Sequence, residues 1–441
     1  MTMMEKIIDK CIRAGAHMAE CFCISSRVLR ISVRDGLVES IKKATPDGVA
    51  IRYFSSDKMA FAHANDLSES SIDGLISSLR RLASKTSVDE FSVLPEPQQY
   101  RRDIGIFDDE FAKLSIENKI DYIQNLESTA LKFDPLIRRS NSAWYEESVT
   151  TRTIVNSLGL AAEFQDTSYA VGLSVVAEKN GWMYPGEGTL YVRRFADLPS
   201  PENIVSRFAG RALRLVGGTP VESGDYEIIF SPLGAVSVLW GMSHALNGEQ
   251  IHRGSSMFAG KIGSQVAAET VSVVDDPHLP WGPASRPADD EGVATSRHIL
   301  IDNGVFREAL YDTKTAAKAK TGSTGSARRG SLQSLPEISP SNLFITPGTN
   351  KAEDLIASCK KGIIVEETQG WGLNSVTGQY SAGIAGVLVK NGQKIRPVGN
   401  VTLAATADDL LDGIEAVADD LDIFNRLSSP TLKVKRMRIG S

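Results

Sequence analysis

The spacing of apolar residues predicts helices and strands in alternating blocks. Residues 86–112, rich in Pro and acidic groups, predict a linker that crosses the surface. The longest β-forming stretch covers residues 141–193. Apolar side chains recur at helical spacing in five segments, namely residues 4–18, a segment that opens at Ser68, and residues 115–133, 201–216 and 232–247.

Tight turns predict the sheet topology and the domains. Asp35-Gly36, Asn303-Gly304 and Asn391-Gly392 each separate two apolar β-forming runs, which is the strongest local signal for a hairpin. Hairpins make antiparallel pairs, whereas parallel strands need long crossovers. We therefore expect an α+β fold with antiparallel sheets and flanking helices. A Gly-Gly-Thr-Pro turn predicts two domains: an α+β domain over residues 1–218, with two loosely similar helix-plus-strands halves, and an antiparallel, β-rich domain over residues 219–441.

Composition and charge narrow the classes of function. The chain has 441 residues, with 48 Lys plus Arg against 54 Asp plus Glu and a net charge of −6. This balance argues against direct nucleic-acid binding, whose affinity comes largely from Lys and Arg. Because the first residues lack the basic and apolar segments of a secretory signal, we expect no export, and no uncharged apolar run reaches the ~18 residues that span a bilayer. Since four Cys are too few for a disulfide framework, we expect reduced thiols and a cytoplasmic protein without membrane contact.

Local motifs of familiar enzymes are absent, and three polar segments remain. No HExxH, GxSxG or Walker loop occurs. Carboxylates at 275–276 and 289–291 could hold a cation or cap turns. The Gly-rich segment 320–330, with two adjacent arginines, could bind an anion or serve only as a connection. The loop 370–378 could close over a ligand with Trp371 or use this side chain to fill the core.

A series of short segments, in this order and spacing, resembles one known family. The segments are Gly48–Arg52, Phe61–Ser68, Phe230–Pro232, Gly260–Gly263, Val274–Pro277, Asp290–Val293, Asn303–Val305, Thr321–Gly325, Asn342–Gly348, Thr377–Ser381 and Val387–Gly392. Together they resemble the TldD/PmbA family, and specifically its PmbA (TldE) branch, over nearly the whole chain.

The resemblance implies a two-subunit enzyme. Members of the two branches are similar in fold and pair as a heterodimer that acts as a metallopeptidase on unfolded peptides, with the zinc ion in the TldD-type subunit. We therefore expect a TldD-type partner, an unfolded peptide substrate, and a dimer that is a heterodimer, or a homodimer when the chain is alone. An older label of the family is modulator of DNA gyrase.

The same resemblance places the metal ligands and shows that they are changed here. TldD-type subunits carry HExxxH on the helix after the boundary strand and a third ligand, a Cys, late in the chain. Here Leu239 stands in place of the first His and Trp240 in place of the Glu, while His244 occupies the second His position. Cys359 does not match the late Cys and is interpreted as a small apolar packing residue. Because Leu and indole offer Zn²⁺ no ligand, we expect no catalytic residue, cofactor or metal in this chain.

Three functions follow, and the first is preferred. The chain is predicted to be a non-catalytic subunit that shapes the peptide channel of the heterodimer. Alternatively, it is a metallopeptidase in which His244 joins His252, His278 or the carboxylates 289–291 around an atypical metal site. A third possibility is a binding protein that modulates DNA gyrase. Position alone suggests the residues that contact peptide or partner, which are His244, Glu249, Asp290, Glu291 and Trp371.

Overall fold

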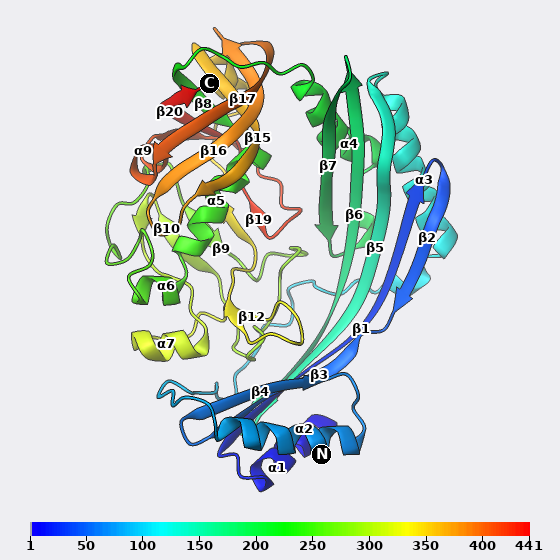
Figure 1. The fold of residues 1–441 in the computed structure, drawn as a ribbon, viewed down its shortest axis with the longest axis vertical. Helices are drawn as coiled ribbons and strands as arrows, with labels where there is room; N and C mark the ends of the chain where they lie inside the picture. Colours follow the sequence, from blue (N-terminus) through cyan, green and yellow to red (C-terminus); the bar gives the residue numbers. More distant parts are fainter. Residues whose placement is uncertain (1) are drawn as a thin grey trace.

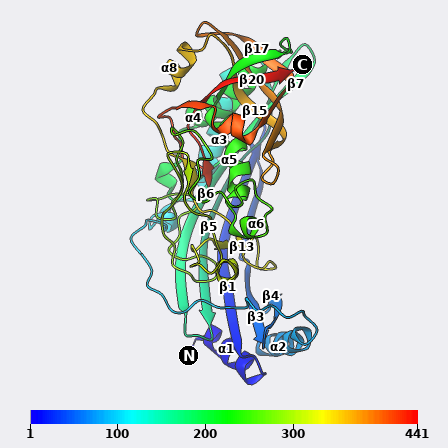
Figure 2. The same cartoon turned by 90° about the vertical axis from the view of Figure 1, so that its left-hand side faces the viewer.

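The first half of the chain builds one large antiparallel sheet. The computed structural model describes residues 2–441, apart from the side chain of Trp371. The seven strands follow the order β4-β3-β1-β5-β6-β7, with β2 paired to the far end of β1. Figure 1 shows the longest strands bending through the height of the molecule, and Figure 2 shows them running behind the C-terminal part. The bounds are β1 Met18–Arg34, β2 Leu37–Ala44, β3 Asp47–Ser55, β4 Lys58–Ala64, β5 Ile137–Asn156, β6 Ala161–Lys179 and β7 Trp182–Val192.

Helices cover this sheet at both of its ends. Apolar faces of α1 and α2 pack on β1 and β3 in one core, and those of α3 and α4 pack on β5 to β7 in a second core. Each helix begins at a Ser or Thr whose hydroxyl accepts a backbone N–H of the first turn. The bounds are α1 Met3–Arg13, α2 Glu69–Ala83, α3 Ile116–Phe133 and α4 Pro201–Leu215, with single 3₁₀ turns η1 Phe111–Lys113 and η2 Phe195–Asp197.

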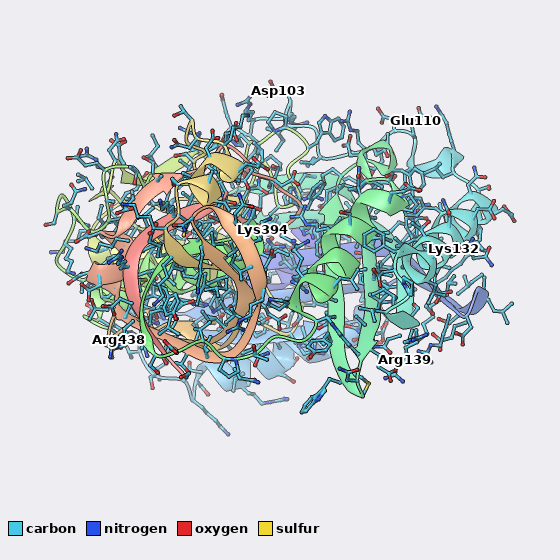
Figure 3. The ribbon with its side chains drawn as sticks, turned by 90° about the horizontal axis from the view of Figure 1, so that it is seen from above. Asp103, Glu110, Lys132, Arg139, Lys394 and Arg438 are labelled. Atoms are coloured by element: carbon cyan, nitrogen blue, oxygen red, sulfur yellow. The ribbon has the colours of Figure 1, made fainter. Side chains whose placement is uncertain are left out.

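The second half is centred on a sheet that closes on itself. Its order is β17-β16-β15-β8-β20-β18, and β17 also pairs with β20. Seen from above in Figure 3, these strands form a ring. The bounds are β8 Gly224–Phe230, β15 Lys361–Leu373, β16 Gln379–Lys390, β17 Gln393–Thr406, β18 Ile414–Val417 and β20 Leu432–Gly440.

Shorter elements fill the space between the closed sheet and the large sheet. Five short strands form one small sheet, and β12 and β13 form a separate hairpin. The strands are β9 Val273–Asp275, β10 His298–Asp302, β11 Val305–Phe306, β12 Ala327–Arg328, β13 Glu337–Ile338, β14 Leu343–Ile345 and β19 Leu427–Ser428. The helices of this half are α5 Pro232–Ala245, α6 Gly248–His252, α7 Thr313–Ala319, α8 Ala352–Ala357 and α9 Ala407–Leu411.

The fold class is confirmed, with two local differences. All three predicted hairpin turns form, and both residues of each turn have positive φ. Two strand pairs, β8 with β15 and β14 with β19, are parallel rather than antiparallel because they join segments far apart in the chain. The helix predicted over residues 4–18 was too long: α1 stops at Arg13, since Gly15 takes φ +100° before β1 begins.

The two halves are tied together by irregular segments. In the predicted linker, the carbonyl of Ile106 accepts the Thr167 N–H of the large sheet at 2.9 Å, and that of Ile104 accepts the Trp281 N–H at 3.4 Å. From the other side, the loop after β12 places Leu332 against Gly48, where an added Cβ would lie 2.3 Å from the Leu332 side chain. The division at residues 218 and 219 stays a prediction. Of the helices in residues 2–441, none has the length and apolar character needed to cross a bilayer.

Candidate functional site

Helix α5 is held rigidly between the closed sheet and the small sheet. Its first turn is capped by Ser231, whose hydroxyl accepts the Gly234 N–H at 3.2 Å, and Pro232 occupies the first helical position. Gly241 lets the helix approach β15 closely, since a Cβ there would lie 2.4 Å from the Leu373 carbonyl oxygen. The direction of each side chain on α5 is therefore fixed by packing.

The three positions of α5 that are compared with a metal motif differ in exposure. Leu239 is fully buried in the C-terminal core, whereas Trp240 is 47% exposed and His244 is exposed. Trp240 and His244, one turn apart, stack edge to face with ring centroids 4.7 Å apart.

The donor set around α5 does not fit a zinc ion. Neither Leu239 nor Trp240 offers a ligand atom for the metal. Within residues 2–441, no three His, Cys, Asp or Glu side chains are grouped in a way that could hold a metal. His252 is exposed, and His278 Nε2 lies 3.1 Å from Thr295 Oγ1. Cys359 is buried among apolar side chains of β8, β15 and β16.

The acidic segments serve as acceptors for backbone and arginine donors. Asp289 accepts the N–H groups of Glu291 and Val293, each at 2.9 Å, and that of Ala327 at 3.0 Å. Asp290 accepts the Arg329 N–H at 2.7 Å. Asp275 similarly accepts the backbone N–H of Ser341 at 2.8 Å and its hydroxyl at 2.9 Å. These contacts correspond to the turn-capping interpretation of the acidic segments.

A buried ion network joins the two halves of the chain. The guanidinium of Arg52 on β3 donates two hydrogen bonds to Glu20 on β1 and one, at 2.7 Å, to Glu291. Arg329, after β12, donates to the same Glu20 carboxylate at 2.7 Å. Burial alone would raise the pKa of Glu291, but the Arg52 charge and the Thr313 backbone N–H hold this pKa below its usual range. Glu291 is therefore an ionised carboxylate in the interior, 1% exposed, that pairs with Arg52 of the large sheet.

A cavity of about 590 Å³ lies beside this network, between the large sheet and the C-terminal half. Its walls combine apolar side chains of β1 and β6 with polar groups of the β12–β13 hairpin, and His244 reaches its rim. Six arginines and three carboxylates line the cavity, which leaves an excess of three positive charges. Partial desolvation at the rim, and then the charge of Arg426, lower the pKa of the His244 imidazole below its usual range. The cavity is thus cationic although the chain as a whole is acidic.

The structure brings together only some of the residues selected from the sequence. His244 and Asp290 line the same cavity. Glu249 lies on α6 and forms ion pairs with Arg253 at 2.5 Å and Lys318 at 3.9 Å. The Trp371 side chain is outside the described residues. Contact of these residues with a peptide or a partner stays a prediction.

Sequence reasoning missed most of the arginines of the cavity. Arg328 and Arg329 belong to the Gly-rich segment that was selected, but Arg152, Arg193, Arg286 and Arg426 come from four other segments. Three of these four are single basic residues, and Arg193 is followed by Arg194, so no local pattern joins them.

Comparison with known proteins identifies the family. Models of the PmbA/TldA metallopeptidase family match three successive parts of the chain: domain 1 at residues 19–84, the central domain at 109–216 and the C-terminal domain at 223–441. The chain belongs to the PmbA/TldD metallopeptidase family, in its PmbA (TldE) branch. It is therefore a metalloprotease-like protein of this family, and the resemblance seen in the short segments is confirmed.

Relatives of the PmbA branch match along almost their entire length. The metalloprotease PmbA of Escherichia coli O157:H7 is 25% identical over 99% of this chain and 96% of its own. The metalloprotease PmbA homolog of Haemophilus influenzae is 25% identical over 98% of this chain and 94% of its own. The crystal structure of TldE from Thermococcus kodakarensis has the same fold, with a TM-score of 0.90, 22% identity and full coverage of both chains.

Proposed function

We propose that this chain is the subunit without a metal centre of its own in a two-subunit peptidase. Its TldD-type partner would hold the zinc ion, and the pair would cleave unfolded peptides in the cytoplasm. The observation that carries the proposal is the pair of side chains on α5, where a buried Leu239 and an exposed Trp240 stand at the positions that supply a ligand and a general base in a catalytic subunit. Relatives named metalloproteases support the use of a metal by the family.

The chain would contribute surfaces to the shared site rather than reacting groups. The cationic cavity opens beside His244 and has room for a few residues of an extended peptide. The outer edge strands β4 and β7 of the large sheet offer backbone groups to which such a peptide can add. In this role the subunit narrows access to the partner's metal and excludes folded proteins.

Mixing experiments test the proposal. A TldD-type chain encoded in the same genome is purified separately, and cleavage of an unfolded peptide is followed by mass spectrometry for each chain alone and for the mixture. We expect no cleavage by this chain alone, cleavage by the mixture, and loss of that cleavage on addition of a chelator.

Controls separate the alternatives. Addition of zinc to the chelated mixture is expected to restore cleavage. Chelator-sensitive cleavage by this chain alone would contradict the proposal and favour an atypical metal site. Failure of the two chains to co-purify, together with retention of DNA gyrase on this chain, would instead favour a gyrase-binding protein.

A further inference from the structure

We propose that the cationic cavity beside α5 binds the C-terminal carboxylate of a peptide, with Arg328 as the hydrogen-bond donor and Arg286 adding positive charge behind it. The choice of a peptide as the occupant rests on the proposed function. The inference that the ligand is an anion rests on the charged residues that line the cavity.

The carboxylates of the cavity do not neutralise its arginines. Asp166 is already shared between Arg152 and Arg193, which donate to its two oxygens. Asp290 accepts the backbone N–H of Arg329. Glu337 is exposed. A positive excess is therefore left in the inner wall.

Two arginines in this wall have no hydrogen-bonded carboxylate. The Nη1 of Arg286 donates to the Ala327 carbonyl at 3.2 Å, and its Nε and Nη2 have no partner but are buried away from the cavity. The partly exposed side chain of Arg328 makes no hydrogen bond or ion pair with any other described residue of the chain. Arg193 in the same cavity is different, because all three of its nitrogens donate to carbonyl or carboxylate oxygens. An anion beside Arg328 would therefore give this guanidinium an acceptor that the chain itself does not supply.

The chemistry of these groups favours a carboxylate. Guanidinium presents a planar pair of donors that matches the two oxygens of a carboxylate. Burial, and then the charges of neighbouring arginines, lower the pKa of Arg328 to about 10, which leaves its positive charge intact at neutral pH. The site is therefore charged under physiological conditions.

The size of the cavity and its apolar wall favour the end of a peptide chain as the ligand. Phe22, Ile24 and Phe164 form the wall contributed by the large sheet and can cover the side chain of a terminal residue. A volume of about 590 Å³ holds a few amino acids but not a nucleic-acid duplex. Inorganic phosphate shares the oxyanion chemistry, so the experiment must distinguish it from a peptide carboxylate.

Calorimetric titration of the isolated full-length chain tests the proposal at low ionic strength. The probes are acetyl-tetraalanine with a free carboxylate, the same peptide with a C-terminal amide, and inorganic phosphate. We expect the free acid to bind at least about 10-fold more tightly than the amide and to bind more tightly than phosphate. Arg286→Gln and Arg328→Gln should each weaken binding of the acid by about 10- to 100-fold.

Matched variants make the outcome decisive. Arg138→Gln removes one charge from the exposed surface of β5 and should leave the affinity unchanged. Arg328 is only partly buried, so its variant keeps the proposal testable if Arg286→Gln does not fold. Equal affinity for acid and amide, phosphate binding without acid binding, or full affinity in Arg328→Gln would each overturn the proposal. Since no partner is present, failure here is distinct from failure of the mixed subunits to cleave a peptide.

Discussion

Replacing Leu239 by His and Trp240 by Glu together is expected to leave the chain without stoichiometric zinc and to lower its free energy of unfolding by about 3 kcal/mol or more. Leu239 is completely buried in the apolar core of the C-terminal half, and the chain has no late Cys at the position of a third zinc ligand. A His at 239 would lose the packing of Leu and bury a polar ring among apolar neighbours. Zinc content by mass spectrometry and urea unfolding measure both effects.

The single substitution Trp240→Glu is the matched control. Because Trp240 is exposed, we expect this variant to lose no more than about 1 kcal/mol. A double variant that holds one zinc ion per chain, with wild-type stability, would show that the two substitutions alone restore a metal site and would contradict this account.

Arg52→Met is expected to lower the free energy of unfolding by about 3–5 kcal/mol. The substitution leaves the buried carboxyl groups of Glu20 and Glu291 without their shared guanidinium. Since Arg52 holds the pKa of Glu291 below its usual range, the stabilisation by Glu291 is present at neutral pH and is lost only as the pH falls through that lowered value. Urea unfolding at pH 7, followed by tryptophan fluorescence, measures the loss.

A surface ion pair provides the control for this network. Arg101 and Asp103 form an exposed pair at 2.9 Å, so Arg101→Met should lower the free energy of unfolding far less than Arg52→Met. Equal losses in the two variants would mean that the buried network does not hold the two halves together.

The sequence predicts the elements whose signals are local. Turns such as Asn303-Gly304 require positive φ at both positions, and both residues have positive φ in the structure. Helix starts at Ser68 and Ser115 depend on a hydroxyl three residues from its N–H partner, which is also a local arrangement. The end of α1 was missed although a local signal was present. Gly15 follows Arg13 closely, and Gly with positive φ commonly ends a helix.

Arrangements that depend on distant segments could not be predicted in the same way. The parallel pair of β8 with β15 joins two segments that are separated in the sequence by β9 to β14. In the cavity, Arg152 and Arg286 meet only because β5 and the segment before the acidic loop pack together. The motif comparison identified the changed residues of α5, but only the packing of α5 shows that Leu239 faces the core.

The zinc content of the separated subunits after reconstitution tests the central claim most directly. Both chains are stripped of metal, mixed with zinc, separated from excess ion, and then resolved from each other before analysis. The account predicts one zinc ion per TldD-type chain and none in this chain, with His244→Ala giving the same result. One zinc ion per molecule of this chain, lost in His244→Ala, would contradict it.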